Sequence, residues 1–322
     1  MHLRCGKIAV LLAAVLLSMF LGGCGGDKPS PVKVGMMPIT DNLPFWLAEE
    51  KGYFQDEGIN VELIPFPSAL ERDSAFAAGK IDAGIGDMLA VAAMNNAGTE
   101  VRAVSVGQGA VPGENRFAIL SAPASSITSP EQLKNVPIAL SLNTINEYIT
   151  DQLLLAEGLQ PGEIIKTSMP KLPIRLEALL NNRVQAATLP DPFATLAEIK
   201  GANLVVDNSQ NTVAQTVIIV RRETLENNLE GVQKLMRAYA RAVEDLQNNP
   251  LHYADLLAKY ARVPDDVLTS RDHPLRLHFS APCLPDEEGV ARVVRWMKEH
   301  DLLEKDLGYN DLVDGRVIGK QS

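Results

Sequence analysis

Polar residues stand at the junctions between predicted strands and predicted helices at five places in this sequence. These turns are Pro38–Asn42, Pro67–Ser68, Gly86–Met88, Ser141–Thr144 and Asp191–Pro192. In a parallel α/β sheet, such turns meet at the carboxyl edge of the strands, where the first N–H groups of each helix lack a partner within the helix. The turns therefore predict a binding site for a small ligand. The alternative is that each polar residue only caps its helix.

The candidate ligand-binding residues come from these turns and from the helix starts that follow them: Thr40, Asp41, Asn42, Trp46, Ser68, Asp87, Met88, Asn143, Thr144 and Asp191. The Trp46 ring could stack on a ligand or pack in the core. If two of Asp41, Asp87 and Asp191 face the site, their charges disfavour a simple anion such as nitrate and favour an organic ligand with an amine or heterocyclic N–H. If they only cap helices, an anion fits equally well.

Patterns typical of catalytic or cofactor sites are weak. The sequence has no phosphate-binding G-x-x-x-x-G-K-[ST] loop and no G-x-S-x-G turn. Gly84–Leu89 begins like a dinucleotide fingerprint but lacks its third glycine. His273 and His278 lie near Asp272, where a metal pair is a weaker interpretation than surface or capping histidines. We therefore predict no catalytic residue, no metal and no cofactor.

The first residues have the layout of a secretory signal. Arg4 and Lys7 form a basic start, Ile8–Phe20 is an apolar run too short to span a bilayer, and Leu21–Cys24 resembles the bacterial lipobox. We expect residues 1–23 to be a lipoprotein signal peptide and Cys24 to be lipidated. Residues 24–31 would be a lipidated polar tether. A plain signal peptide with an incidental cysteine, or an uncleaved anchor, are the alternatives.

Charge and cysteine content narrow the class further. The 322-residue chain has 30 basic and 40 acidic residues, a net charge of −10, which disfavours a nucleic-acid partner. With Cys5 in the signal and Cys24 lipidated, Cys283 is left alone, so no intramolecular disulfide is expected. A small buried side chain is the favoured role for Cys283 over a catalytic one.

Short apolar runs alternate with helical periods from Val32 to about residue 220, which predicts an α/β fold with mainly parallel sheets. A long amphipathic stripe follows from Val232 to Leu246. We place residues 32–120 together with 214–322 in the first lobe, and residues 121–213 in the second. Two close chain crossings should join the lobes.

Several phrases of the sequence, in this order, resemble one family of substrate-binding proteins, those for nitrate, sulfonate, taurine and thiamine-pyrimidine precursors. The matching phrases are Val32–Gly35, Leu43–Phe54, Glu57–Leu63, Ala77–Gly84, Ser129–Lys134 and Leu189–Ala194. The resemblance implies a two-lobe periplasmic-binding-protein-like fold of the class II type, each lobe a mainly parallel sheet flanked by helices. It also implies hinge closure over one ligand.

By this resemblance the chain is a solute-binding lipoprotein and not an enzyme. It would capture a small organic molecule, sulfonate-, nitrate- or pyrimidine-like, and deliver it to an ABC importer. Its partners would be the permease and ATPase subunits and, through the lipid, a membrane. We expect a monomer, exported by the signal peptide and anchored in the cell envelope, facing the periplasm or the outside of the cytoplasmic membrane.

Three other functions stay open at this point. A purely structural envelope lipoprotein would show no ligand-dependent change in stability. A ligand-sensing lipoprotein that signals to a membrane partner would have the same sequence features. The family also includes a eukaryotic pyrimidine-synthase branch, which is an enzyme. That branch is cytosolic, and this chain lacks a cysteine-rich cluster like that branch's iron-binding motif.

Overall fold

The structure of the protein is a computed structural model, which describes residues 31–318 except 214, 249 and 276. The predicted signal peptide, Cys24 and all of the tether but Pro31 lie outside the described residues. Within the described part, no helix is both long and apolar enough to cross a bilayer.

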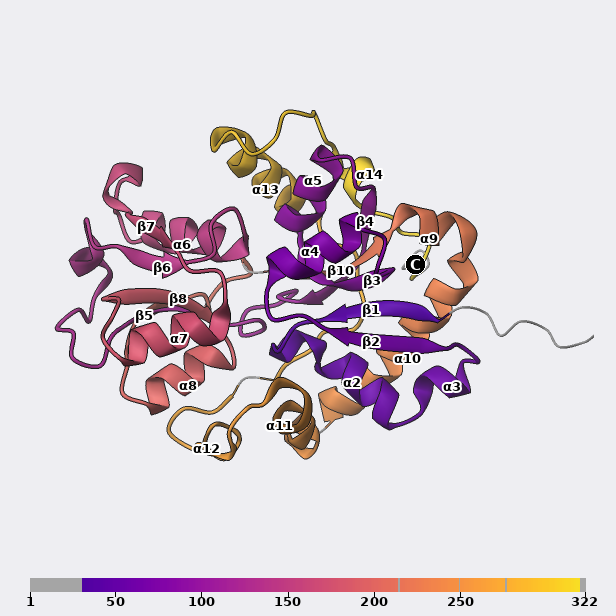
Figure 1. The fold of residues 1–322 in the computed structure, drawn as a ribbon, viewed down its shortest axis with the longest axis horizontal. Coiled ribbons are helices and arrows are strands. Elements are labelled where there is room, and N and C mark those ends of the chain that lie inside the picture. Colours follow the sequence, from indigo (N-terminus) through magenta and orange to yellow (C-terminus); the bar gives the residue numbers. More distant parts are fainter. Residues whose placement is uncertain (1–30, 214, 249, 276, 319–322) are drawn as a thin grey trace, which may run out of the picture. The chain divides into compact units, whose positions relative to one another are not determined.

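Ten strands form two five-stranded sheets with the same topology (Figure 1). The first sheet has the order β2-β1-β3-β10-β4. Its strands are β1 (Val32–Met36), β2 (Val61–Pro65), β3 (Ala83–Asp87), β4 (Val101–Gln108) and β10 (Thr216–Arg221). The second sheet has the order β7-β6-β8-β5-β9. Its strands are β5 (Phe117–Ser121), β6 (Ile138–Leu140), β7 (Lys166–Ser168), β8 (Ala186–Pro190) and β9 (Asn203–Asp207).

In each sheet one strand runs against the others. Strand β10 pairs antiparallel with both β3 and β4, and β5 pairs antiparallel with both β8 and β9. These two strands are the ones that follow a passage of the chain from one sheet to the other, after β4 and after β9. The sheets are therefore mixed but mainly parallel, and the chain passes between them twice.

We call the first sheet with its helices lobe 1 and the second sheet with its helices lobe 2. The helices that cover the first sheet come from both ends of the described chain. They are α2 (Leu43–Glu50), α3 (Tyr53–Asp56), α4 (Ala69–Ala77), α5 (Met88–Asn96), α9 (Arg222–Asn227), α10 (Leu229–Asn248), α11 (Asp255–Ala261), α13 (Glu287–Glu299) and α14 (Tyr309–Leu312). Helix α10 packs on α2 and α3, whereas α13 and α14 pack on α5 (Figure 1).

Lobe 2 carries α6 (Ile145–Ala156), α7 (Leu172–Leu180) and α8 (Phe193–Ile199), and the short α12 (Asp265–Leu268) contacts α8. Four single-turn 3-10 helices complete the list: η1 (Thr40–Asn42), η2 (Pro130–Leu133), η3 (Pro161–Glu163) and η4 (Pro250–Tyr253). The two opposite faces of the first sheet pack into different hydrophobic cores. Ile218 and Val220 pack with α2 and α10, while Val217 and Ile219 pack with α5 and α13.

Strand β5 differs from the sequence-based expectation. No strand was predicted at Phe117–Ser121, and the first lobe was expected to extend to residue 120. The structure places all of β5 in the second sheet, between β8 and β9. Its four apolar residues form a run too short to show a strand or helix period.

Candidate ligand-binding site

A cavity of about 50 Å³ lies where the carboxyl ends of the parallel strands of both sheets meet. Lobe 1 contributes the loop after β1 with Asp41, the first turn of α4, and the end of β3 with Asp87. Lobe 2 contributes Ser141 after β6, the start of α6 and Pro190 at the end of β8. We call this space the interlobe cavity. Its position agrees with the rule that α/β sheets bind ligands outside the carboxyl ends of their strands.

Asp41 is a buried carboxylate in this wall, with a residue exposure of 2%. Its Oδ1 is 3.4 Å from the Oγ1 of Thr40, and its Oδ2 has no hydrogen-bond partner. Burial raises the pKa of Asp41 and the Asp191 carboxylate raises it further, while hydroxyl groups, Thr216 first, oppose the rise. Asp41 therefore lines the cavity and keeps one buried carboxylate oxygen without a hydrogen-bond partner.

Asp87 both caps a helix and lines the cavity. Its Oδ1 accepts a hydrogen bond of 2.8 Å from the backbone N–H of Ala90, in the first turn of α5. Burial raises the pKa of Asp87 to about 6, although the Arg72 guanidinium and the Ala90 N–H oppose the rise. The two interpretations of this residue, cap and site residue, are therefore compatible.

Two buried arginines hold the cavity walls in equivalent places. Arg72 of α4 donates from Nη1 to the Ile85 carbonyl of β3 at 2.6 Å, and Arg175 of α7 donates from Nη1 to the Thr188 carbonyl of β8 at 2.7 Å. In both cases the acceptor lies 13 residues after the arginine. Each arginine thus ties the helix that begins at the cavity to the strand that ends there.

The surroundings of the two arginines differ. Arg72 has a carboxylate partner, since its Nε donates to Asp73 Oδ1 at 2.9 Å. Arg175 donates only to neutral oxygens, namely the carbonyls of Met169, Pro170 and Thr188, the Asn146 amide oxygen and the Ser141 hydroxyl. Burial lowers the pKa of Arg175 to about 9, which still leaves the side chain charged at neutral pH. Lobe 2 therefore encloses a positive charge that has no carboxylate partner among the described residues.

Arg175 also orients two groups of the lobe 2 wall. Because the Asn146 Oδ1 accepts from Arg175 at 2.8 Å, the Nδ2 of this amide is directed elsewhere, with one long contact of 3.4 Å to Thr144 Oγ1. Thr144 is the N-cap of α6 and accepts from the Asn146 backbone N–H. Ser141, Thr144 and Asn146 all line the cavity.

A larger groove of about 730 Å³ lies beside the interlobe cavity and shares Met37 with it. We call it the Trp46 groove. The Trp46 ring stacks on Tyr260 of α11, with centroids 5.6 Å apart and planes inclined by 14°. Phe66 and Phe193 complete an aromatic lining drawn from both lobes. Trp46 is thus packed in lobe 1 and also faces a hollow, so both interpretations of this residue have a basis.

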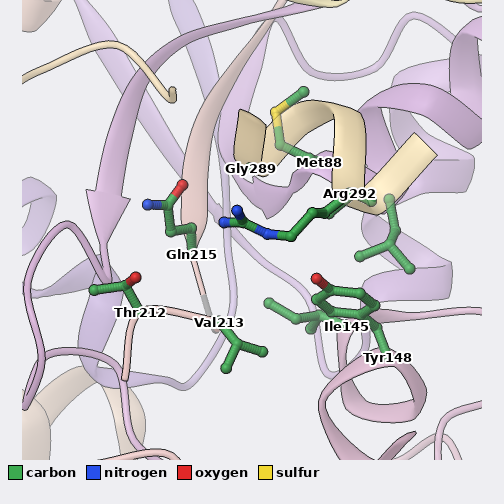
Figure 2. A pocket seen from close by; sticks show the side chains of 10 residues that line it. Met88, Ile145, Tyr148, Thr212, Val213, Gln215, Gly289 and Arg292 are labelled. Atoms are coloured by element: carbon green, nitrogen blue, oxygen red, sulfur yellow. The ribbon is translucent and has the colours of Figure 1, made fainter. Parts of the chain in front are cut away.

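Met88, another predicted residue, lines a separate pocket between α5, α6 and α13. Figure 2 shows the Arg292 side chain extending from α13 toward Gln215, with the Tyr148 ring beside it. Burial raises the pKa of Tyr148, and Arg292 opposes the rise.

The other five predicted residues are not in the lining of the interlobe cavity. Asn42 donates from Nδ2 to the Met37 carbonyl at 2.9 Å, and Ser68 caps α4 by accepting from the Glu71 N–H. Asp191 accepts from the N–H and hydroxyl of Thr195 near the start of α8. The Thr40 hydroxyl is 3.4 Å from Gln108 Oε1, and Asn143 adopts a positive φ of 59°. Their roles in ligand binding stay predictions.

Sequence reasoning missed the two arginines. A signal was present, because each occupies a helical position four residues before a fully buried apolar side chain, Phe76 or Leu179. A charged residue on the apolar face of a helix needs a buried partner. The partner itself, a strand carbonyl in both cases, could not be read from the sequence.

Two sheets of this topology, with a cavity between their strand ends, define a protein of the periplasmic-binding-protein fold. The crystal structure of the periplasmic aliphatic sulphonate binding protein SsuA from Escherichia coli superposes with a TM-score of 0.74, covering 90% of this chain and 99% of that chain at 19% identity. The sequence itself matches the family described as NMT1/THI5 like over residues 39–252. The chain belongs to the NMT1/THI5-like family.

Two further comparisons involve a protein named for binding and an enzyme. A protein of Bacillus subtilis (strain 168), named for aliphatic sulfonate binding, is 24% identical over 97% of this chain and 96% of its own length. The desulfurization enzyme DSZB has the same fold, with a TM-score of 0.64 and 14% identity, covering 90% of this chain and 98% of that chain. The fold therefore serves both binding proteins and an enzyme.

Proposed function

We propose that this protein is the solute-binding component of an ABC importer, and that lobes 1 and 2 close on a small organic molecule in the interlobe cavity. The observation that carries the proposal is the composition of the cavity wall, in which polar residues of both lobes converge at the strand ends. A ligand that touches both walls stabilises the closed arrangement over the open one and so shifts the population toward it. The permease and ATPase subunits would then receive the solute from the closed form.

The fold allows such a motion at two places. The described chain passes from one sheet to the other after β4, through residues 109–116, and after β9, where residues 208–213 and 215 are described, and none of these residues belongs to a strand. The lobes touch through buried side chains, since Met37 and Ile39 of lobe 1 pack with Leu172 of lobe 2. They also touch through exposed groups at the cavity side, such as Lys171 Nζ and Glu71 Oε1 at 3.7 Å. An exposed ion pair contributes at most about 1 kcal/mol, so the buried apolar contacts are the larger part of what an opening motion has to separate.

The proposal includes the location of the protein in the cell and the fate of its solute. The chain is exported by its first 23 residues, lipidated at Cys24 and held at the cell envelope as a monomer. It releases its solute chemically unchanged, since the Asp87 carboxylate and the Arg175 guanidinium serve as a helix cap and as a tie within lobe 2. The family membership and the sulfonate-binding relatives support this assignment.

The test combines ligand binding with lobe closure. A thermal-unfolding screen of sulfonates, nitrate, pyrimidines, amines and amino acids, with a small-molecule extract of the host cells, should find a stabilising ligand. At a ligand concentration of 100 times the Kd, binding adds about 2.7 kcal/mol to the free energy of unfolding. Small-angle X-ray scattering should show compaction with the same ligand, and mass spectrometry should recover that ligand unaltered.

A matched pair of variants in α4 locates the site. Ala69 lines the interlobe cavity, whereas Ala77 is exposed at the other end of the same helix. Ala69→Leu should weaken binding by at least ~10-fold, about 1.4 kcal/mol, because its added carbons fill the cavity. Ala77→Leu should leave the Kd unchanged. If no compound or extract stabilises or compacts the protein, or if both variants bind alike, the proposal fails.

A further inference from the structure

Four buried side-chain atoms in the described part of the chain have no hydrogen-bond partner, and they belong to Asp41, Asn42, Arg72 and Asp191. Three of the four are acceptor oxygens: Asp41 Oδ2, Asn42 Oδ1 and Asp191 Oδ2. Buried polar atoms without partners are rare because each costs about 1–3 kcal/mol. Two of the four residues, Asp41 and Arg72, line the interlobe cavity, and the three acceptors outnumber the one donor. This excess of acceptors favours a ligand that brings N–H donors.

We propose that the solute carries a protonated nitrogen that binds the Asp41 carboxylate, and an apolar body that extends into the Trp46 groove. This inference rests on the proposed solute-binding function and specifies its ligand. A primary ammonium brings three N–H donors and one positive charge. It would satisfy the unpartnered Oδ2 of Asp41, a residue that lines the cavity.

The charges around Asp41 favour a cation. Asp41 has no ion pair with any described residue, and the nearby Asp191 lies 3.6 Å from Arg116 Nη1. Arg116 is shared, because Glu198 and Asp207 lie closer to it, at 2.8 and 2.7 Å. One guanidinium thus faces three carboxylates, so carboxylates outnumber the cation in the cluster next to Asp41.

The arginines near the cavity do not provide an obvious anion site. Arg72 forms an ion pair with Asp73, whose Oδ1 is 2.7 Å from the Nη2 that lacks a hydrogen bond, and the charge of Arg72 limits the rise in the pKa of the Asp87 carboxyl. Arg175 makes hydrogen bonds through all three of its nitrogens to oxygens of its own lobe. An anion would have to displace these bonds, and it would also meet Asp41. A sulfonate or nitrate group is therefore disfavoured here by charge.

The apolar part of the proposed ligand follows from the neighbouring groove. Met37 lines both spaces, and its Sδ is 3.5 Å from Arg72 Nη1. Beyond it lie Trp46, Phe66 and Phe193, which can stack on a ring or cover an alkyl chain. The groove also has two cations, Lys259 and Arg262, but Arg262 is exposed and Lys259 is paired with Glu50 at 2.6 Å. Because Lys259 and Arg262 are positively charged, we expect the part of the ligand in the Trp46 groove to be uncharged and not a second ammonium.

The test uses probes that share a body and differ in the head group. We would measure thermal shifts and Kd values for benzylamine and 2-phenylethylamine against the alcohol and the sulfonate of the same body. The amines should bind at least ~10-fold more tightly than either partner. Asp41→Asn should reduce amine binding by at least ~10-fold and bring it close to alcohol binding. The control is Asp272→Asn, at an exposed aspartate away from the cavity lining, which should bind as the wild type does.

The possible results distinguish a failure of the cationic-ligand proposal from a failure of the proposed solute-binding function. Binding of the sulfonates with no binding of the amines overturns the cationic ligand and leaves the solute-binding function standing. The same holds if the cell extract stabilises the protein but no amine does. Amine binding that survives Asp41→Asn, in a variant whose unfolding curve shows a folded protein, overturns the role of Asp41. Failure of every probe and of the extract removes both proposals.

Discussion

Asp87 allows the most quantitative prediction, because its burial and its cap have separable effects on stability. In Asp87→Asn the amide oxygen can still accept the hydrogen bond from the Ala90 N–H, since Asn caps helices as well as Asp. What the substitution removes is the cost of burying a carboxylate. In the wild type that cost appears as a pKa raised from 3.8 to about 6.

The effect of Asp87 on the free energy of unfolding depends on pH, because the pKa of its carboxyl differs between the folded and the unfolded state. Below pH 3.8 the Asp87 carboxyl is protonated in both the folded and the unfolded state, so it contributes no penalty. As the pH rises from about 4 to 6, the unfolded state ionises first and the fold loses stability. A difference of about two pKa units corresponds to ~3 kcal/mol, which stays constant above the folded pKa.

Urea unfolding at pH values from 4 to 7 measures this difference. Asp87→Asn should match the wild type near pH 4 and should exceed it by up to ~3 kcal/mol at pH 7. Ser68→Ala is the control, because it removes the N-cap of α4 and should cost about 1 kcal/mol at every pH. An Asp87→Asn variant that is less stable than the wild type at pH 7, or shifted equally at all pH values, would refute the reasoning.

Two further predictions concern other parts of the chain. Arg175→Met removes hydrogen bonds to five oxygens, of which the Thr188 carbonyl and the Ser141 hydroxyl are in buried bonds, and should lower the free energy of unfolding by about 2–4 kcal/mol, measured by urea unfolding. Arg183→Met, at an arginine whose side chain is 71% exposed, should change it by less than about 0.5 kcal/mol. Cys24→Ala should abolish fatty-acid labelling and move the protein from the membrane to the soluble fraction, whereas Cys283→Ala should do neither. Unchanged labelling of Cys24→Ala would contradict the lipobox interpretation.

The regular elements of the cavity walls could be predicted closely because their sequences carry clear periods and stops. The turns Ser141–Thr144 and Gly86–Met88, expected between a strand and a helix, lead into α6 at Ile145 and into α5 at Met88. In both cases the residue before the helix, Thr144 or Asp87, accepts a backbone N–H of the first turn. Local chemistry alone determines these helix starts, so a single sequence is sufficient to find them.

The features that need partners from distant parts of the chain could not be predicted. Strand β10 enters the first sheet between β3 and β4, although the whole second sheet separates it from them in sequence. The burial of Asp41 depends on this insertion, since Thr216, the first residue of β10, lies beside it in the cavity wall. Hydrophobic period shows that a segment is a strand, but not which sheet it joins or in which direction.

The equivalent arginines suggest how the binding site keeps its geometry while the lobes move. Arg72 and Arg175 each join the first turns of a helix to the end of the strand that follows it, so the polar turns of each wall are fixed within their own lobe. A motion that opens the cavity then has to occur at the two passages between the sheets, because deforming either wall would break several buried hydrogen bonds at about 1–3 kcal/mol each. The unpartnered oxygen of Asp41 is carried on such a fixed wall, so closure can bring it to a ligand without reorganisation. The stability that Asp41 and Asp87 cost the free protein would be recovered only when a donor of the right charge occupies the cavity.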